Sequence, residues 1–442
     1  MLNFPDDFKW GVATSSIQIE GGAETDGKSP SVWDVYVRES GMVRDGATPA
    51  VACDSYHRYE TDIAMMKDLG VNAYRFSMSW PRILPEGRGP INQKGADYYN
   101  RLIDALLENG IEPFVTLYHW DMPQSVEEDC GWRDRRIADI FAYYAETAVK
   151  IYGDRVKQWV TFNEIDAFLG QGYAGNSKAP GHNLPPEEMP QVYHHVLLSH
   201  GAAVRAMRAV RDDLSIGCAE NTQSPIPVIE TPENITAAKR AWDIDIGRLF
   251  QPMALGSYPE GLERYPEDVR TGDMELIGSG VDFMGANIYG GHYVEATEDE
   301  KGFRYVPFPE GYPASAKENW LRVTPEAAYW CARLCAEQYN VSKVYMMENG
   351  FSTPGDRPAR NDRDDLDRLS FLRQYLTWLH RAIDEGYPVR GYFLWSLMDS
   401  FEWISGFTSR FGIYHTDFET LERKPRLSAE WYKAVVRNNR LM

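Results

Sequence analysis

The sequence predicts an α/β fold, namely a single (β/α)8 barrel that spans residues 1–442 as one domain and carries long active-site loops. Eight short apolar runs alternate with helical patterns, as expected of parallel strands joined by helices. The 442 residues contain no linker, and no internal repeat of about 20–50 residues, that would divide the chain. A doubly wound open sheet is the competing fold. No Gly-x-Gly-x-x-Gly or Walker motif follows the first predicted strand, so the usual nucleotide site of that fold lacks support.

The predicted strands are near-continuous in apolar residues, which is typical of a parallel sheet that is buried on both faces. Eight such units close naturally into a barrel. In chain order the strands are expected at Trp10–Thr14, Ala73–Ser77, Pro113–Leu117, Gln158–Phe162, Ile216–Ala219, Asp282–Asn287, Val344–Met347 and Gly391–Trp395.

Helical patterns lie between these strands, for example at Tyr59–Leu69, Ala96–Asn109, Ile137–Tyr152 and Leu366–Glu385. Gly70 and Gly110 follow two of them at the position where a left-handed residue commonly ends a helix. A typical barrel needs only ~250 residues. We therefore expect the additional length in loops near 170–190, 220–235, 290–320 and 350–365, which are rich in proline and glycine.

The composition excludes several classes of partner. A formal net charge of −19 argues against nucleic acid and against an anionic membrane surface, because both require a basic protein face. No run approaches the ~18 apolar residues of a membrane span, and the amino-terminal segment does not have the pattern of a secretion signal. The five cysteines form no CxxC pair and have no nearby histidine, so we expect buried thiols, no metal, no cofactor and a cytoplasmic location. Aromatic residues make up 13% and suit sugar faces, although on composition alone a large aromatic core is the better explanation.

Two glutamates come directly at the ends of predicted strands, Glu164 after the fourth and Glu348 after the seventh. The active site of a barrel lies at the carboxyl ends of its strands, so both side chains would project into one cavity. Paired carboxylates perform glycoside hydrolysis: a separation of ~5–5.5 Å retains the anomeric configuration and ~6.5–9.5 Å inverts it. Each glutamate alone could equally be a helix cap or an ion-pair partner, so the residues by themselves leave these alternatives open.

The motifs of the whole chain resemble those of glycoside hydrolase family 1, the β-glucosidase family. The matching segments are Phe8–Ser16 with Gln18 and Glu20-Gly21, Ser31–Asp34, Asp54–Tyr59, Tyr74–Trp80, Leu117–Asp121, Thr161–Glu164, Asn287–Tyr289, Met347–Gly350, Trp395–Asp399, Phe401–Trp403 and Arg410–Gly412. The resemblance implies a retaining mechanism, with Glu348 as nucleophile and Glu164 as acid/base. It also implies that Arg75 and Tyr289 keep Glu348 charged and oriented.

The resemblance further implies a substrate-binding set. Its members are Gln18, His119, Asn163 and Glu402 on the glycone, Trp395 stacked on the sugar face, Trp403 and Trp120 closing the pocket, Asn287 and Tyr289 at the end of the sixth strand, and Trp320 as platform for the aglycone. Glu402 would repel a phosphate, which disfavours the alternative of a 6-phospho-β-glucosidase. Glu164 argues against the thioglucoside-cleaving branch, which has Gln at this position.

The chain departs from the family pattern at three places. Ile165-Asp166 replaces the usual Pro-Trp after the acid/base, with no change of length up to Ala179-Pro180-Gly181. Met347 replaces the Thr or Ser before the nucleophile, and the usual context after Trp320 is missing. Asp166 is therefore expected near the leaving group, and Asn221, Thr222 and Gln223 either contribute polar contacts there or form an ordinary solvated loop.

The sequence thus favours a retaining, exo-acting β-glucosidase. We expect β-galactosidase or β-fucosidase activity beside it, possible transglycosylation, and small-molecule substrates such as β-glucosides and cellobiose in cellulose degradation. The chain would be a monomer or a homo-oligomer. The alternatives are a non-catalytic sugar-binding barrel and an inverting or endo-acting glycosidase.

Overall fold

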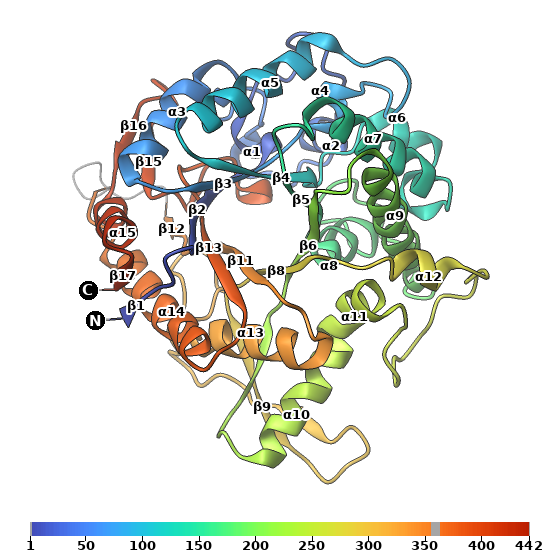
Figure 1. Cartoon of the computed structure of the whole chain (residues 1–442), viewed down its shortest axis with the longest axis vertical. Helices are drawn as coiled ribbons and strands as arrows, with labels where there is room; N and C mark the ends of the chain where they lie inside the picture. Colours follow the sequence, from blue (N-terminus) through green and yellow to red (C-terminus); the bar gives the residue numbers. More distant parts are fainter. Residues whose placement is uncertain (1, 355–362, 442) are drawn as a thin grey trace.

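A computed structural model describes residues 2–354 and 363–441. Its centre is a closed barrel of eight parallel strands in the spatial order β11-β13-β2-β3-β4-β5-β6-β8 (Figure 1). The strands are β2 (Lys9–Ala13), β3 (Ala73–Ser77), β4 (Glu112–Tyr118), β5 (Gln158–Asn163), β6 (Ser215–Asn221), β8 (Phe283–Asn287), β11 (Val344–Asn349) and β13 (Val389–Trp395). Each predicted strand overlaps one of these, which confirms the predicted barrel.

Strand boundaries differ from the prediction by a few residues at the ends that carry the polar motifs. The strand expected to end at Met347 continues to Asn349, and the strand expected to end at Phe162 continues to Asn163. Glu348 therefore lies within β11 and pairs with Asn287 of β8. The prediction missed these last strand residues because it identified strands by their apolar residues, whereas these residues are polar.

Helices surround the barrel (Figure 1). The main ones are α3 (Ser55–Leu69), α5 (Gln93–Glu108), α7 (Ile137–Tyr152), α9 (Met189–Val210), α11 (Arg248–Leu255), α13 (Glu326–Tyr339), α14 (Leu366–Asp384) and α15 (Leu427–Asn438). In α5 the buried side chains Tyr99, Ile103 and Leu106 recur every three or four residues, so one stripe of the helix packs inward. Gly70 ends α3 as predicted: its φ is 84°, in the left-handed region that glycine adopts without strain.

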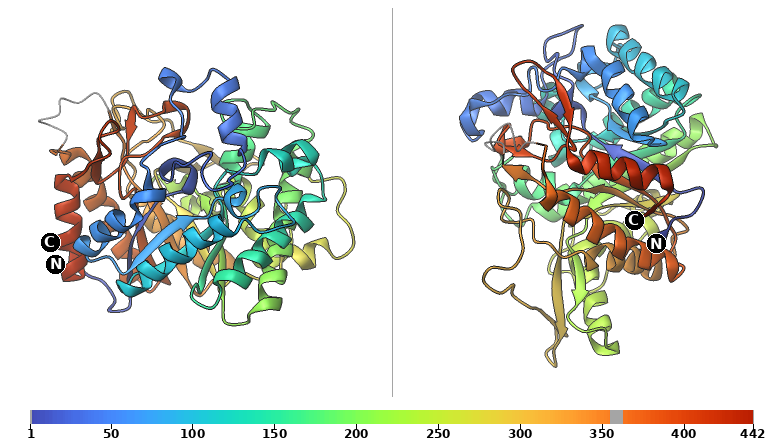
Figure 2. Two further views of the ribbon diagram at one scale, coloured as in Figure 1. Left: turned by 90° about the horizontal axis from the view of Figure 1, so that it is seen from above. Right: turned by 90° about the vertical axis from the view of Figure 1, so that its left-hand side faces the viewer.

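Shorter elements complete the described chain. They are α1 (Ser16–Ile19), α2 (Val32–Glu39), α4 (Trp80–Ile83), α6 (Gln124–Asp129), α8 (Ile165–Phe168), α10 (Pro232–Trp242), α12 (Asp273–Ile277), β1 (Leu2–Asn3), β7 (Ser224–Pro227), β9 (Gly291–Ala296), β10 (Phe303–Tyr305), β12 (Thr353–Pro354), β14 (Ser409–Arg410), β15 (Tyr414–Thr416), β16 (Arg423–Pro425) and β17 (Arg440–Leu441). Strands β1 and β17 pair, so the two ends of the chain lie side by side in both figures of the fold (Figures 1 and 2).

The expected loops at 220–235 and 290–320 contain regular structure. Residues 220–235 and 290–320 contribute a second sheet, in the order β10-β9-β7, and α10, which together extend from one side of the barrel (Figure 1, and Figure 2, right). Strand β7 contains Pro225 and Pro227 and lies at the edge of its sheet, the position that tolerates proline. The prolines thus predicted an irregular segment that is free of central-strand pairing, but the expectation of a loop without a strand was wrong. Of the loop expected at 350–365, residues 355–362 lie outside the described residues.

The core is rich in aromatic side chains, in agreement with the composition. Its largest fully buried side chains include the indoles of Trp33, Trp80, Trp132, Trp159, Trp242 and Trp330. All five cysteines are buried free thiols. In residues 2–354 and 363–441, no helix is both long and apolar enough to cross a membrane.

Candidate active site

A cavity of about 600 Å³ opens at the carboxyl ends of the barrel strands. This volume is within the range of ~300–1,000 Å³ that small-molecule sites have. The predicted residues that line it are His119, Trp120, Asn163, Glu164, Tyr289, Trp320, Glu348, Trp395, Glu402 and Trp403. The barrel therefore brings together side chains from five strand ends and from the loop after β13. Arg75 and Asn287 lie behind these residues, and both are buried.

Glu348 is buried between two hydrogen-bond donors. Arg75 donates from Nη1 to one carboxyl oxygen at 2.5 Å, and the Tyr289 hydroxyl donates to the other at 2.7 Å. Burial raises the pKa of Glu348, while the guanidinium and the hydroxyl oppose that rise. The carboxylate is thus held in one orientation with a cation beside it.

The carboxyl group of Glu164 has a different environment. It accepts one hydrogen bond, from Asn287 Nδ2 to Oε1 at 2.9 Å, and its charge has no ion-pair partner within the described residues. Burial, together with the negative charge of Glu348, raises the pKa of Glu164 to about 7. At neutral pH a protonated fraction of Glu164 therefore coexists with its carboxylate, as a group that both gives and takes a proton requires.

The backbone of Glu164 is also unusual. Its φ of 50° lies in the left-handed region, which a residue with a side chain seldom adopts. The next helix, α8, begins immediately after it, and the buried Glu220 accepts a hydrogen bond from the Ile165 amide at 2.6 Å. Glu220 thus satisfies an amide that a helix start leaves without an intrahelical partner. Sequence reasoning gave Glu220 no role.

Asn163 links the two carboxyl groups to the neighbouring polar residues. Its side-chain oxygen accepts from Arg75 Nη2 at 2.5 Å and from Asn287 Nδ2 at 2.9 Å. Its Nδ2 lies 3.1 Å from Nε2 of His119. Burial lowers the pKa of His119 well below the ordinary value. A neutral imidazole and an oriented amide therefore face the cavity.

The indole rings form one wall of the cavity. Trp120 and Trp403 stack with their centroids 4.3 Å apart, and the imidazole of His119 lies nearly parallel to Trp395 at 5.7 Å. Flat faces of this kind suit the C–H face of a sugar ring. Burial also raises the pKa of Glu402 well above its ordinary value, and its Oε1 accepts a hydrogen bond from the Ser400 hydroxyl at 3.1 Å.

Lys178 is a cavity residue that sequence reasoning missed. Its ammonium nitrogen lies 3.9 Å from the centroid of the Trp120 ring and 5.6 Å from that of Trp403. Burial lowers the pKa of Lys178 to about 8, against the attraction of Glu164 and Glu402. Its position directly before Ala179-Pro180-Gly181, which the resemblance aligned, is the signal that could have found it.

Gln18 does not line the cavity. It is fully buried, donates to the carbonyl of Phe401 at 2.8 Å and accepts from the Ser15 hydroxyl at 2.6 Å. These contacts hold the residue that precedes Glu402, so contact of Gln18 with the glycone stays a prediction.

The residues at the three departures from the family pattern, and the nearby segment 221–223, have different positions. Asp166, Asn221 and Gln223 line the cavity. Thr222 is buried, and its hydroxyl lies 2.9 Å from that of Ser224. Met347 is buried behind the site, and Trp320 lines the cavity with half of its surface exposed.

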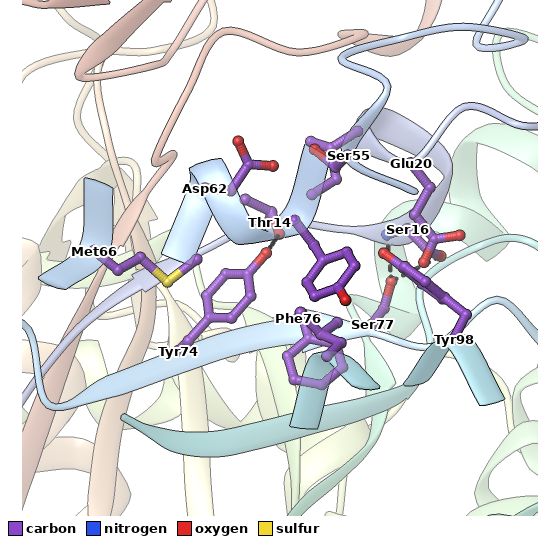
Figure 3. A pocket seen from close by; sticks show the side chains of 13 residues that line it. Thr14, Ser16, Glu20, Ser55, Asp62, Met66, Tyr74, Phe76, Ser77 and Tyr98 are labelled. Carbon is purple, nitrogen blue, oxygen red and sulfur yellow. Dashed lines mark hydrogen bonds between the residues drawn. The ribbon is translucent and has the colours of Figure 1, made fainter. Parts of the chain in front are cut away.

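A second cavity lies away from these residues, behind β3 and beside α3 (Figure 3). Its volume is about 20 Å³, close to that of a single water molecule. It is lined by side chains such as Tyr74, Phe76 and Asp62, and it is too small for a sugar. The cavity of about 600 Å³ is the candidate active site because both Glu164 and Glu348 line it.

Two carboxyl groups in one cavity, one held beside a cation and one titrating near neutrality, can serve as nucleophile and proton donor toward a glycoside. The comparisons agree with this chemistry: the profile of glycosyl hydrolase family 1 matches residues 1–441. The chain belongs to glycosyl hydrolase family 1. Like the other members, it is a glycoside hydrolase.

Related proteins match over almost their whole length. Beta-glucosidase A of Acetivibrio thermocellus is 40% identical, with 99% of each chain covered. A 1,4-beta-D-glucan glucohydrolase of Thermotoga neapolitana is 40% identical, with 100% of each covered. The solved family 1 β-glucosidase of Thermotoga maritima superposes with a TM-score of 0.90 at 40% identity over 100% of both chains, and one of its structures is a complex with galacto-hydroximolactam.

Proposed function

We propose that the protein is a retaining, exo-acting β-glucosidase in which Glu348 is the nucleophile and Glu164 the acid/base. The observation that carries the assignment is the unequal environment of the two carboxyl groups. Glu348 receives a guanidinium and a hydroxyl, whereas Glu164 receives only an amide. Since hydrogen bonds and a nearby cation favour the charged form, Glu348 ionises first and Glu164 retains the proton.

The closeness of the two carboxyl groups supports the retaining mechanism. Both line the same cavity, and the negative charge of Glu348 raises the pKa of Glu164, an effect that requires a short separation. A glycosyl ester forms where the two groups are ~5–5.5 Å apart. Membership of glycosyl hydrolase family 1 supports this arrangement.

The reaction follows in two displacements. The Glu348 carboxylate attacks the anomeric carbon while Glu164 donates its proton to the glycosidic oxygen, so the bond to the aglycone breaks and a glycosyl ester forms. Glu164, now a carboxylate, takes a proton from water, whose oxygen attacks the same carbon and releases Glu348. Two inversions give net retention.

The polar groups of the cavity favour a neutral glycone. Glu402 and the ring wall fit the hydroxyl groups and C–H face of a hexose, and Glu402 disfavours a 6-phosphate. The names of the relatives support β-glucosides and β-1,4-glucans as substrates, with cellobiose as a test case. The galacto-configured ligand of one relative supports β-galactosidase or β-fucosidase activity beside it. Transfer of the glycosyl group to another acceptor follows whenever that acceptor replaces water at the ester.

Mutation of each glutamate tests the assignment. Glu348→Ala should abolish hydrolysis of an aryl β-glucoside, and added azide should restore turnover with an α-glucosyl azide product. Glu164→Ala should spare glycosylation by substrates with good leaving groups, such as 2,4-dinitrophenyl β-glucoside, far more than cellobiose. Normal activity of the Glu348→Ala enzyme, or equal losses on both substrates for Glu164→Ala, would exclude these roles. A wild-type protein that binds glucosides in calorimetry without hydrolysing them would instead be a sugar-binding barrel.

A further inference from the structure

Asp166 stands at the wall of the cavity two residues after Glu164. It lies in the first turn of α8 and lines the cavity with 45% of its side chain exposed. Glu164 is the proposed proton donor to the leaving group, and Asp166 follows it by two residues in the lining of the same cavity, so we expect Asp166 on the leaving-group side.

Two side chains from separate helices fix one oxygen of this carboxylate. Tyr193, in α9, donates from its hydroxyl to Oδ1 at 2.5 Å, and Arg248, at the start of α11, forms an ion pair with the same oxygen. The guanidinium of Arg248 also lies over the ring of Tyr193, 4.8 Å from its centroid. The backbone amide of Asp166 donates to Glu220 at 3.4 Å. The carboxylate is thus oriented before any ligand arrives.

The other oxygen, Oδ2, makes no hydrogen bond to any residue of the described chain. An ionised acceptor that is already oriented binds a hydroxyl donor without the entropic cost of ordering its own side chain. An apolar group placed against it would remove water from a charge and return no hydrogen bond.

Other polar side chains line the same cavity. The amides of Gln171, Asn221 and Gln223 line it, and Trp320 presents a half-exposed ring to the same cavity. A flat ring together with several hydrogen-bonding groups matches a pyranose, which has C–H faces and a rim of hydroxyl groups.

We propose that Asp166 is a specificity-determining residue that accepts a hydrogen bond from a hydroxyl group of a leaving sugar, so that the enzyme prefers β-linked disaccharides and short oligosaccharides over glucosides of apolar alcohols. This inference rests on the proposed function. The same contact serves an acceptor sugar in transfer: the acceptor oxygen bonds the anomeric carbon, the ester bond to Glu348 breaks, and the acceptor proton passes to the Glu164 carboxylate.

The test is the ratio of kcat/KM for cellobiose to kcat/KM for octyl β-glucoside. Asp166→Asn keeps the shape of the side chain and removes the charged acceptor. A hydrogen bond to a charged group is worth ~1.5–3 kcal/mol, so the ratio should fall about 10-fold or more. Tyr193→Phe frees the carboxylate from one of its fixed contacts and should lower the ratio by a smaller factor. Asp212→Asn, an exposed aspartate that does not line the cavity, is the matched control and should leave the ratio unchanged.

A second measurement uses the unmodified enzyme. Among monodeoxy glucose acceptors, loss of the one hydroxyl that meets Asp166 should reduce transfer about as much as Asp166→Asn does, and should have little further effect in that variant. An unchanged ratio in Asp166→Asn, or a ratio that already favours the octyl glucoside in the wild type, overturns the role of Asp166. Absence of hydrolysis of every β-glucoside by the wild-type protein contradicts the proposed function itself, so the two failures are distinct.

Discussion

The hydroxyl of Tyr289 sets how readily Glu348 ionises, and its removal gives the sharpest test of the site. In Tyr289→Phe the ring remains, while the donor 2.7 Å from Glu348 Oε2 is lost. That donor stabilises the carboxylate, so its loss raises the pKa of Glu348 further above its ordinary value. A hydrogen bond to a charged group is worth ~1.5–3 kcal/mol, which is a factor of about 10–100 in the equilibrium between the charged and neutral forms of the carboxyl group.

The pH dependence of kcat/KM for an aryl β-glucoside measures this rise. Because Glu348 must be ionised to act as the proposed nucleophile, the acidic limb of the profile should move to higher pH, and activity on that limb should fall about 10-fold or more. Tyr152→Phe is the control: its hydroxyl is also buried, but it donates to the carbonyl of Ala96, far from the cavity in the fold. An acidic limb that stays in place in a folded Tyr289→Phe enzyme would refute the reasoning that Tyr289 holds Glu348 ionised.

Two further predictions follow from the charges. The Lys178 ammonium lowers the pKa of Glu164. Lys178→Met should therefore raise that pKa and move the alkaline limb of the pH profile of kcat/KM from near pH 7 to higher pH. An alkaline limb that moves to lower pH, or does not move, would contradict this electrostatic role. Asp399 is fully buried between Arg426 and Arg410, and these cations lower its pKa from 3.8 to about 2, against the effect of burial. Its contribution to the free energy of folding, about 2 kcal/mol, is therefore complete above pH ~4 and is lost as the pH falls through about 2. The free energies of unfolding of the wild type and of Asp399→Asn, measured with urea, should converge over that range. A difference in unfolding free energy that is the same at pH 6 and pH 2 would exclude this linkage.

The sequence by itself determined the barrel and the polar motifs at its strand ends. Apolar, β-rich runs of the right length identify buried parallel strands whatever their neighbours are, because such strands are covered on both faces. The ends of those strands then identified Glu164 and Glu348 as residues of one cavity. The short strand β7 escaped notice because its prolines are tolerated only at a sheet edge, and the sequence does not say which strand lies at an edge.

The tertiary structure decided how the charges are distributed. Arg75 and Glu348 are 273 positions apart in the chain, yet closure of the barrel places them in contact. Lys178 has no motif of its own, and the fold brings it to the cavity that Glu348 lines. The same closure gives Glu348 a cation and a hydroxyl, leaves Glu164 with an amide, and sets the Asp166 carboxylate between Tyr193 and Arg248. Ionisation depends on burial and on the distance to other charges, and both quantities exist only after distant segments have packed together.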